Sequence, residues 1–175
     1  MIVGLSGRMG AGKSTVAGFL VDECGFTRHS MASPLKSMLR CLGLDDRHLY
    51  GDMKTTPCDV LGGRTPRYAM QTLGTEWGRK MIDPDLWMNA WRFTLPEGDV
   101  VCDDIRFPNE VATIRSLGGI LIRIDRSALE VSSHESETHV FDVDHVLEND
   151  GSIEQINEKV YHLVLRHLCL PVTGS

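Results

Sequence analysis

Short apolar runs alternate along this chain with stretches of helical spacing, and the alternation predicts its main elements. Continuous apolar runs at 2–5, 100–102 and 120–122 have the length of buried strands. Between the runs, segments 14–24 and 109–117 carry apolar residues at helical spacing, and a glycine follows each of them. Strands that alternate with helices predict an α/β fold with a parallel sheet flanked by helices.

The final third of the chain continues this pattern after a polar interruption. Segment 126–142 is rich in Ser, Glu and His, which predicts a loop or a lid. A short strand is predicted at 145–147. The helix that follows starts at Ser152, and Gln155 completes a sequence of capping-box form.

The middle of the chain, about 28–96, is dominated by helix-start signals instead of strands. Three dipeptides place a capping residue before a proline that suits the first helical position: Ser33-Pro34, Thr65-Pro66 and Asp83-Pro84. Gly43 and Gly74 are the expected ends of two of these helices. We therefore expect a single domain whose core, about 1–27 and 97–175, carries a helical insertion.

Composition narrows the class of protein. The chain has 175 residues, with 18 Lys+Arg against 24 Asp+Glu and a net charge of −6. An acidic balance without a basic block disfavours a nucleic-acid partner, and the lack of a long apolar stretch predicts no membrane span. The five cysteines are widely spaced without a CxxC pair, which favours reduced thiols in the cytoplasm.

Residues 7–14 match the pattern G-x-x-x-x-G-K-[ST] at every fixed position. Gly7 and Gly12 let the backbone turn and bring its N–H groups close to phosphate oxygens. Lys13 reaches the β and γ phosphates, and the Ser14 hydroxyl can ligate Mg²⁺. The predicted helix that follows directs its positive end at the anion. The motif predicts binding of a nucleoside triphosphate, but it does not separate a kinase from a GTPase or an ATPase.

A second acidic feature follows the apolar run Val100–Cys102. Asp103 and Asp104 come directly after that run, as in a Walker B strand. The acidic residue that ends such a strand holds Mg²⁺ near the phosphates. Phosphoryl transfer between two nucleotides also brings their negatively charged phosphates together, so that several cationic side chains are needed to balance the charge. The candidate cations are Arg64, Arg67, Arg79, Arg106, Arg123 and Arg126.

Longer segments resemble a known family. They are 4–15, 31–36, 67–79, 83–87, 104–110, 118–120, 134–137 and 149–152. In this order they resemble the bacteriophage-type deoxynucleoside monophosphate kinases of the P-loop nucleoside monophosphate kinase superfamily. The resemblance implies a three-layer P-loop NTPase fold, a helical insertion that binds the acceptor monophosphate, and a short lid (about 126–142) over the donor ATP. A phage-encoded enzyme of this kind would work in the host cytoplasm.

The motif and the resemblance together assign roles to individual residues. The Asp-x-Arg-Phe-Pro-Asn-Glu segment makes Asp104, and not Asp103, the motif aspartate. Lys13, Asp104 and Arg126 are the expected catalytic residues, and Ser14 with Asp104 would hold Mg²⁺. Residues expected at the donor are Gly7, Met9, Gly10, Ala11, Gly12, Lys13, Ser14 and Thr15. Residues that the resemblance implies at the acceptor are Lys36, Arg67, Gln71, Arg79, Trp87 and Arg106.

Three hypotheses about function follow. The leading one is a kinase that uses ATP and Mg²⁺ to convert a deoxynucleoside monophosphate to the diphosphate by in-line transfer. The second keeps the fold but phosphorylates a hydroxyl group, on a modified base in DNA or a coenzyme precursor, with Asp104 as base. The third is a nucleotide-binding regulator without transfer chemistry. Small-molecule nucleotides are the expected partners, and a homodimer is left open.

Overall fold

The computed structural model describes residues 1–127 and 141–169. The chain divides into two compact units. Unit 1 contains Met1–Ser30 and Pro96–Ser175, and unit 2 contains Met31–Leu95. Most of the predicted lid, and the whole of segment 134–137, lie outside the described residues.

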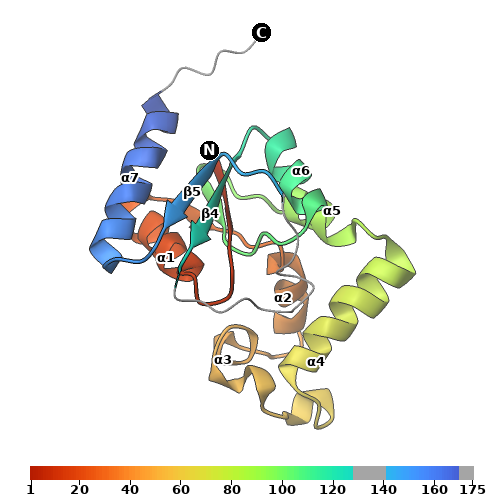
Figure 1. Ribbon diagram of the computed structural model, residues 1–175. Helices are drawn as coiled ribbons and strands as arrows, with labels where there is room; N and C mark the ends of the chain where they lie inside the picture. Colours follow the sequence, from red (N-terminus) through yellow and green to blue (C-terminus); the bar gives the residue numbers. More distant parts are fainter. Residues whose placement is uncertain (128–140, 170–175) are drawn as a thin grey trace. The chain divides into compact units, whose positions relative to one another are not determined.

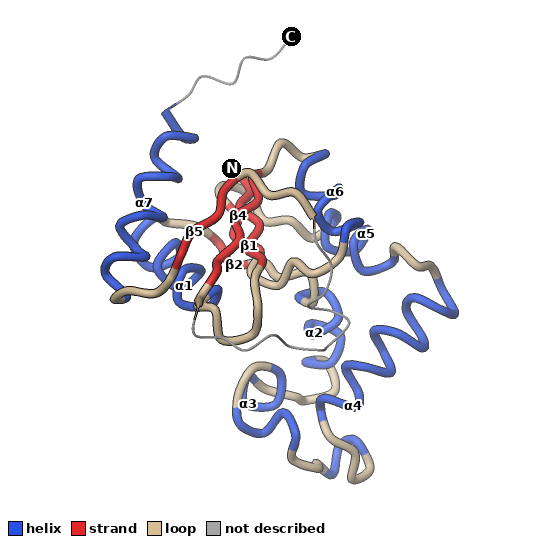
Figure 2. Tube along the Cα trace, viewed as in Figure 1, coloured by secondary structure: helices blue, strands red, loops and turns tan. Residues whose placement is uncertain are grey.

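Unit 1 is built on a five-stranded sheet in the order β2-β3-β1-β4-β5, and every pairing in it is parallel. The strands lie side by side in Figure 2, where they are red. Their bounds are β1 Ile2–Ser6, β2 Thr27–Arg28, β3 Val100–Cys102, β4 Ile120–Asp125 and β5 His145–Glu148. The predicted α/β fold with a parallel sheet is therefore confirmed.

Helices cover both faces of this sheet (Figure 1), which gives three layers. The helices of unit 1 are α1 (Lys13–Cys24), α6 (Pro108–Ser116) and α7 (Ile153–Cys169). Val3 and Leu5 face α1 and α7 in one fully buried cluster. Gly4 faces the other way, because a Cβ there would lie 2.9 Å from Leu121 and 3.6 Å from Ile114 of α6. The alternation along β1 reflects the two-residue period of a strand.

Local sequence signals explain several ends of these elements. Gly25 ends α1 with a φ of 74°, a conformation that glycine adopts without steric cost. Ser152 and Gln155 form the predicted capping box, since each side chain accepts from the other's backbone N–H, at 3.3 and 3.0 Å. Strand β2 was not predicted, because its two residues are too few to show a period.

The regular elements of unit 2 are all helices or helical turns. Its elements are α2 (Ser33–Arg40), α3 (Asp46–Leu49), α4 (Pro66–Gln71), the π-helix η3 (Thr72–Ile82), α5 (Leu86–Phe93) and the 3₁₀ turns η1 (Asp52–Thr55) and η2 (Asp59–Leu61). Five buried side chains form its core: Leu35, Leu39, Leu44, Leu49 and Trp87. The unit thus has a hydrophobic cluster of its own.

One of the three predicted helix caps in this unit is confirmed. The Thr65 hydroxyl accepts from the backbone N–H of Tyr68 and starts α4. In α2 the cap is Ala32, so that Ser33 already lies in the first turn. In α5 the cap is Asp85, because the carboxylate of Asp83 accepts from the Asp85 N–H and closes a turn before the helix.

The predicted helix end at Gly74 is wrong. The helix that starts at Pro66 continues through this glycine to Ile82, and it changes from α to π geometry at Thr72. The backbone N–H of Asp83 donates to the carbonyl of Gly78 at 3.0 Å, the five-residue spacing of a π-helix. A glycine inside a helix is tolerated when a packing contact requires it, and the contact here involves Trp87.

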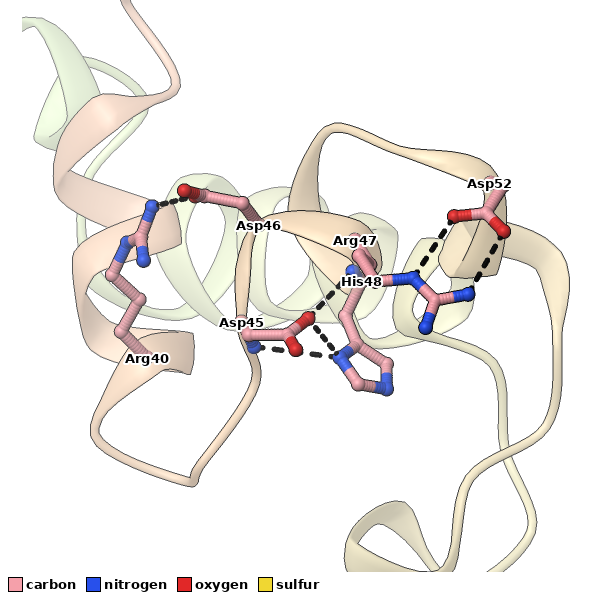
Figure 3. A network of polar contacts seen from close by, with 6 residues as sticks. All are labelled: Arg40, Asp45, Asp46, Arg47, His48 and Asp52. Carbon is pink, nitrogen blue, oxygen red and sulfur yellow. Dashed lines mark hydrogen bonds and ion pairs between the residues drawn. The ribbon is translucent and has the colours of Figure 1, made fainter.

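A network of exposed charges surrounds α3 (Figure 3). Asp45 caps this helix, and its side chain and that of His48 satisfy each other's backbone N–H groups. The hydrogen bonds from His48 lower the pKa of Asp45. The ion pairs of this network are Arg40 with Asp46 and Arg47 with Asp52. Exposed pairs of this kind contribute little to stability, so we assign the network a local role in shaping the α2–α3 corner.

Two compositional expectations can be compared with the structure. Within residues 1–127 and 141–169, the structure contains no helix long and apolar enough to cross a membrane. Among the described residues, Cys24, Cys41, Cys58 and Cys102 carry free thiols.

Candidate active site

The phosphate loop joins β1 to α1 in a conformation that depends on glycine. Gly7, Gly10 and Gly12 all have positive φ angles, of 133°, 82° and 106°. A Cβ at Gly7 would lie 2.3 Å from the backbone oxygen of Ile124. A Cβ at Gly12 would lie equally close, 2.3 Å, to the side-chain nitrogen of Asn149. The glycines are therefore needed both for the turn and for its close contact with β4 and the end of β5.

Lys13 folds back over this loop. Its ammonium group donates to the carbonyl oxygens of Gly7 at 2.6 Å and Arg8 at 2.8 Å. The backbone N–H of Ala11 donates to the same Arg8 carbonyl at 3.1 Å. The positive charge of Lys13 therefore lies at the loop that the sequence motif predicts to bind phosphates. Met9, Ser14 and Thr15 are exposed around it.

Asn149, which lies just after β5, fastens the loop from outside. Its side-chain amide donates to the carbonyl of Ala11 at 2.8 Å, and its backbone N–H donates to that of Asp125 at 2.7 Å. The next residue, Asp150, accepts from the backbone N–H and the hydroxyl of Ser127, at 2.7 and 2.5 Å. No motif in the sequence predicts a role for Asn149. An asparagine directly after a parallel strand was the available signal.

Arg126 lies beside this second contact and is exposed. The two hydrogen bonds from Ser127 lower the pKa of Asp150, and the charge of Arg126 acts in the same direction. Arg126 is the first residue of the predicted lid and thus lies close to the carboxyl ends of β4 and β5. The structure places Arg126 within unit 1, as it does the phosphate loop.

The two aspartates after β3, Asp103 and Asp104, lie in different environments. Asp103 is only 8% exposed and accepts hydrogen bonds from Arg28 and, at 2.7 Å, from the Ser30 hydroxyl. Burial alone would raise the pKa of Asp103, but the hydrogen bonds from Arg28 and Ser30 outweigh it and lower the pKa. Asp104 is half-buried and accepts from the Cys102 thiol at 3.3 Å. Asp103 is therefore a buried structural carboxylate, and Asp104 is the more accessible of the two.

Arg106 lies at the start of α6, where its backbone is held firmly. Glu110 is 5% exposed, and its carboxylate accepts from the N–H groups of Arg106 and Phe107, at 2.7 and 3.1 Å. This arrangement is the acidic half of a capping box. The side chain of Arg106 is exposed, close in sequence to Asp104.

The remaining predicted acceptor residues belong to unit 2. Arg67 and Gln71 are exposed on α4, and Arg79 is half-buried on η3 of the same continuous helix. The Lys36 ammonium lies 3.7 Å from the centre of the Tyr50 ring, a cation–π contact. These residues lie at the surface of unit 2, whereas Trp87 does not.

Trp87 is 7% exposed and belongs to the hydrophobic core of unit 2. Its indole N–H donates to the carbonyl of Gly74 at 2.7 Å, and its ring lies 6.2 Å from that of Trp77. The family resemblance implies that Trp87 lies at the acceptor. The structure shows its ring packed against η3 with its polar group bonded, and its place at the acceptor stays a prediction.

The residues present fit a magnesium ion held partly by substrate. The structure shows no cluster of three or more His, Cys, Asp or Glu that could hold a metal, as far as residues 1–127 and 141–169 are concerned. Magnesium in phosphoryl-transfer sites needs only one or two protein oxygens, since phosphates and waters supply the others. Ser14, at the start of α1, and Asp104, at the end of the neighbouring strand β3, offer oxygens of the right kind.

A glycine-dependent phosphate loop between β1 and α1, with a carboxylate after the adjacent strand of a parallel sheet, defines the class of P-loop nucleotide-binding proteins. Comparison with known proteins narrows this class. The family model described as deoxynucleotide monophosphate kinase matches residues 64–160. The chain belongs to this deoxynucleotide monophosphate kinase family, and it is accordingly a kinase, a phosphotransferase.

Two individual relatives agree with that assignment. The chain is 35% identical over 185 residues to a protein of Acanthamoeba polyphaga mimivirus named "Putative deoxynucleotide monophosphate kinase", covering 94% of this chain and 96% of the viral protein. It is similar in structure to TT1252 from Thermus thermophilus, with a TM-score of 0.51, 20% identity, and coverage of 99% and 98% of the two chains. The second likeness supports the fold alone. The predicted family is therefore confirmed.

Proposed function

We propose that this kinase transfers the terminal phosphoryl group of ATP to a deoxynucleoside 5′-monophosphate, which gives ADP and the diphosphate. The phosphate loop carries the donor side of the proposal, since its three positive-φ glycines and Lys13 form an anion-binding turn at the N-terminus of α1. Membership in the deoxynucleotide monophosphate kinase family supports the acceptor side.

On the donor side, Lys13 exchanges its bonds to the Gly7 and Arg8 carbonyls for the β and γ phosphates of ATP. Backbone N–H groups of residues 7–14 bind the same phosphates. Mg²⁺, held by Ser14 and Asp104 with phosphate oxygens, would supply positive charge where negative charge develops during transfer. Arg126 adds a further cation near the donor.

On the acceptor side, cationic and polar side chains hold the monophosphate in line. Arg67, Arg79 and Arg106 supply guanidinium groups, which match phosphate oxygens in two-pronged hydrogen bonds. Lys36 adds a point charge, and Gln71 offers an amide to the base. A monophosphate is already anionic at neutral pH, so the attacking oxygen needs no general base. Asp104 would be required as a base only for a hydroxyl acceptor.

The test is ADP release with ATP, Mg²⁺ and each of dAMP, dCMP, dGMP and dTMP. We expect turnover with at least one of them, and a loss of about 100-fold or more in Lys13→Ala, because charge stabilisation dominates phosphoryl transfer. The matched control is Lys159→Ala, which also removes a lysine bonded to a backbone carbonyl, that of Glu148 at 2.9 Å. Turnover with a hydroxyl acceptor and none of the monophosphates would contradict the proposal.

A further inference from the structure

The side chain of Ser6 is a buried polar group at the edge of the phosphate loop. Ser6 is the last residue of β1 and comes directly before Gly7, the first glycine of the loop. It is only 2% exposed, and its hydroxyl has no hydrogen-bond partner within residues 1–127 and 141–169. Nearly all buried polar groups in folded proteins are hydrogen-bonded, so this exception calls for a specific explanation.

An unbonded buried hydroxyl costs free energy, because the group loses its hydrogen bonds to water and gains none in return. Another buried serine of unit 1 avoids this cost. Ser30 is 6% exposed, and its hydroxyl donates to Oδ1 of Asp103 at 2.7 Å. An alanine at position 6 would fill the same place in the strand without the penalty. A serine there is therefore explained best by a state of the chain in which its hydroxyl gains a partner.

The direction of the Ser6 side chain follows from the two-residue period of β1. Leu5 belongs to the buried cluster that packs against α1 and α7. Gly4 faces the opposite layer, since a Cβ there would lie 3.6 Å from Ile114 of α6. Successive side chains of a strand point to opposite faces of the sheet, so Ser6 points to the α6 face, as Gly4 does.

The carboxylate of Asp104 lies on the same face of the sheet. Val101 packs in the cluster against α1 and α7, so the next residue of β3, Cys102, points to the α6 face. The Cys102 thiol donates to Oδ1 of Asp104 at 3.3 Å. This contact holds the carboxylate on the α6 side, where the Ser6 hydroxyl also points.

Ser6 and Asp104 also lie next to each other along the edge of the sheet. The last register pair between β1 and β3 joins Gly4 to Cys102. Ser6 and Asp104 each lie two residues further on. The two chains stay together there, because the carbonyl of Leu5 accepts a 3.3 Å backbone hydrogen bond from the residue after Asp104. Neighbouring strands are about 4.8 Å apart, a separation that rotation of the two side chains can bridge with a hydrogen bond.

We propose that Ser6 is a positioning residue, whose hydroxyl donates to the Asp104 carboxylate when nucleotide and Mg²⁺ are bound. The inference rests on the proposed function, in which Asp104 helps to hold the cation. A thiol is a weak hydrogen-bond donor and a hydroxyl is a stronger one. Exchange of the Cys102 thiol for the Ser6 hydroxyl fixes the carboxylate more firmly and satisfies the buried hydroxyl in the same step. Partners of this kind orient the residues that hold a metal.

This role predicts opposite effects of Ser6 on stability and on cation binding. A buried hydroxyl that is unbonded before the nucleotide binds destabilises the fold, so its removal does not weaken the chain. The same removal takes a hydrogen bond from Asp104 once the cation is present. A serine with a purely structural role behaves differently, because its replacement lowers stability and leaves the cation unaffected. The sign of the change in stability therefore separates the two roles.

The first experiment measures urea unfolding without nucleotide and compares Ser6→Ala with Ser30→Ala. The second variant is the matched control, because it removes a buried serine hydroxyl that has a partner. We expect Ser6→Ala to unfold at the same urea concentration as the wild type or a higher one, and Ser30→Ala at a lower one. A loss of stability in Ser6→Ala equal to that in Ser30→Ala would overturn the inference.

The second experiment measures the contribution of the cation to nucleotide binding. Calorimetry with AMP-PNP, a non-hydrolysable ATP analogue, is carried out in Mg²⁺ and in EDTA. Relative to the wild type, we expect Ser6→Ala to bind the analogue equally well in EDTA and about tenfold more weakly in Mg²⁺. Ser30→Ala should keep both affinities. Affinities of Ser6→Ala that equal those of the wild type in both conditions would overturn the inference.

A double-mutant cycle tests whether Ser6 acts through Asp104. In the Asp104→Asn background, Ser6→Ala should cause no further loss of Mg²⁺-dependent binding, whereas additive losses would overturn the inference. In turnover, Ser6→Ala should lower kcat and leave the acceptor KM unchanged. A wild-type chain that phosphorylates none of the monophosphates would overturn the proposed function, and the binding measurements would still decide the role of Ser6. Equal binding of AMP-PNP by the wild type in Mg²⁺ and in EDTA would overturn the inference.

Discussion

The side-chain amide of Asn149 donates a 2.8 Å hydrogen bond to the backbone carbonyl of Ala11, a residue 138 positions earlier in the chain. The bond joins the turn after β5 to the phosphate loop. The same amide nitrogen would meet a Cβ at Gly12 at 2.3 Å, so the two segments are packed as closely as their backbones allow. The curvature of the loop is thus set partly by a residue outside its own motif.

Asn149→Ala should therefore loosen the loop without removing any group from it. We expect the KM for ATP to rise several-fold and the free energy of unfolding to fall by about 1 kcal/mol, because one partly buried hydrogen bond is lost. Steady-state kinetics and urea unfolding provide the two measurements. Asn89→Ala, at an exposed position of α5, should change neither. An unchanged KM for ATP in Asn149→Ala would contradict this role.

The buried carboxylate of Asp103 should make the free energy of unfolding depend on pH in the acid range. Its pKa in the folded chain lies below its usual value, so the carboxylate stabilises the fold above the unfolded pKa of about 4, and this contribution is lost as the pH falls through the folded pKa. Chemical unfolding between neutral pH and about pH 3 should show the loss. Asp103→Asn should weaken that acid response and lower stability at neutral pH by about 1–3 kcal/mol, since Arg28 is partly exposed.

The neighbouring carboxylate is the natural control for that experiment. Asp104→Asn should keep the acid response, because Asp103 remains paired with Arg28 and Ser30. On the proposed function it should lose most turnover instead. A variant pair with the opposite outcome, in which Asp103→Asn abolishes activity in a stable chain, would reverse the assignment of the two aspartates.

His145 and His167 form a second pH-dependent contact, with their Nε2 atoms 2.9 Å apart. Burial lowers the pKa of His145, and the neighbouring His167 and Arg166 act in the same direction, while Asp144 opposes them. A lowered pKa means that the unfolded chain binds the proton first, so stability falls as the pH drops below about 6.5. His167→Gln should flatten this fall in pH-dependent unfolding, whereas His162→Gln, at an exposed residue of α7, should leave it unchanged.

Glu110 should affect stability more than an ordinary surface carboxylate. Its removal leaves the N–H groups of Arg106 and Phe107 without their acceptor at the start of α6, which costs about 1–3 kcal/mol. Thermal or urea unfolding of Glu110→Ala measures this cost, and Glu97→Ala is the exposed control. Because the Arg106 backbone is released, we also expect a higher acceptor KM. Equal stability of the two variants would contradict the capping role.

Much of unit 1 could be predicted from sequence, because the determinants there are local. Buried strands appear as apolar runs, and the phosphate loop requires glycine at fixed positions such as Gly7 and Gly12. The short strand β2 could not be predicted from two residues. Its absence from the prediction also concealed the pairing of Arg28 with Asp103, which distinguishes the two adjacent carboxylates.

In unit 2 the prediction failed where tertiary contacts override local preference. Gly74 suggested a helix end, yet the Trp87 indole holds its carbonyl within a continuing helix. A π-helix of this length also produces no recognisable repeat of apolar positions in the sequence. For the same reason the packing of the Trp87 ring against Gly78 could not be predicted from the sequence.

The places where the chain leaves and re-enters unit 1 have a consequence for recombination between relatives. Strands β2 and β3 pair in register, Thr27 with Val100 and Arg28 with Val101, so Ser30 and Pro96 lie within a few residues of hydrogen-bonded neighbours. The whole of Met31–Leu95 is therefore an excursion between two adjacent strands. A gene crossover at these two points would replace the helical unit with that of another family member and leave every strand pairing unchanged. Chimaeric enzymes can therefore be made by exchanging this unit as a whole.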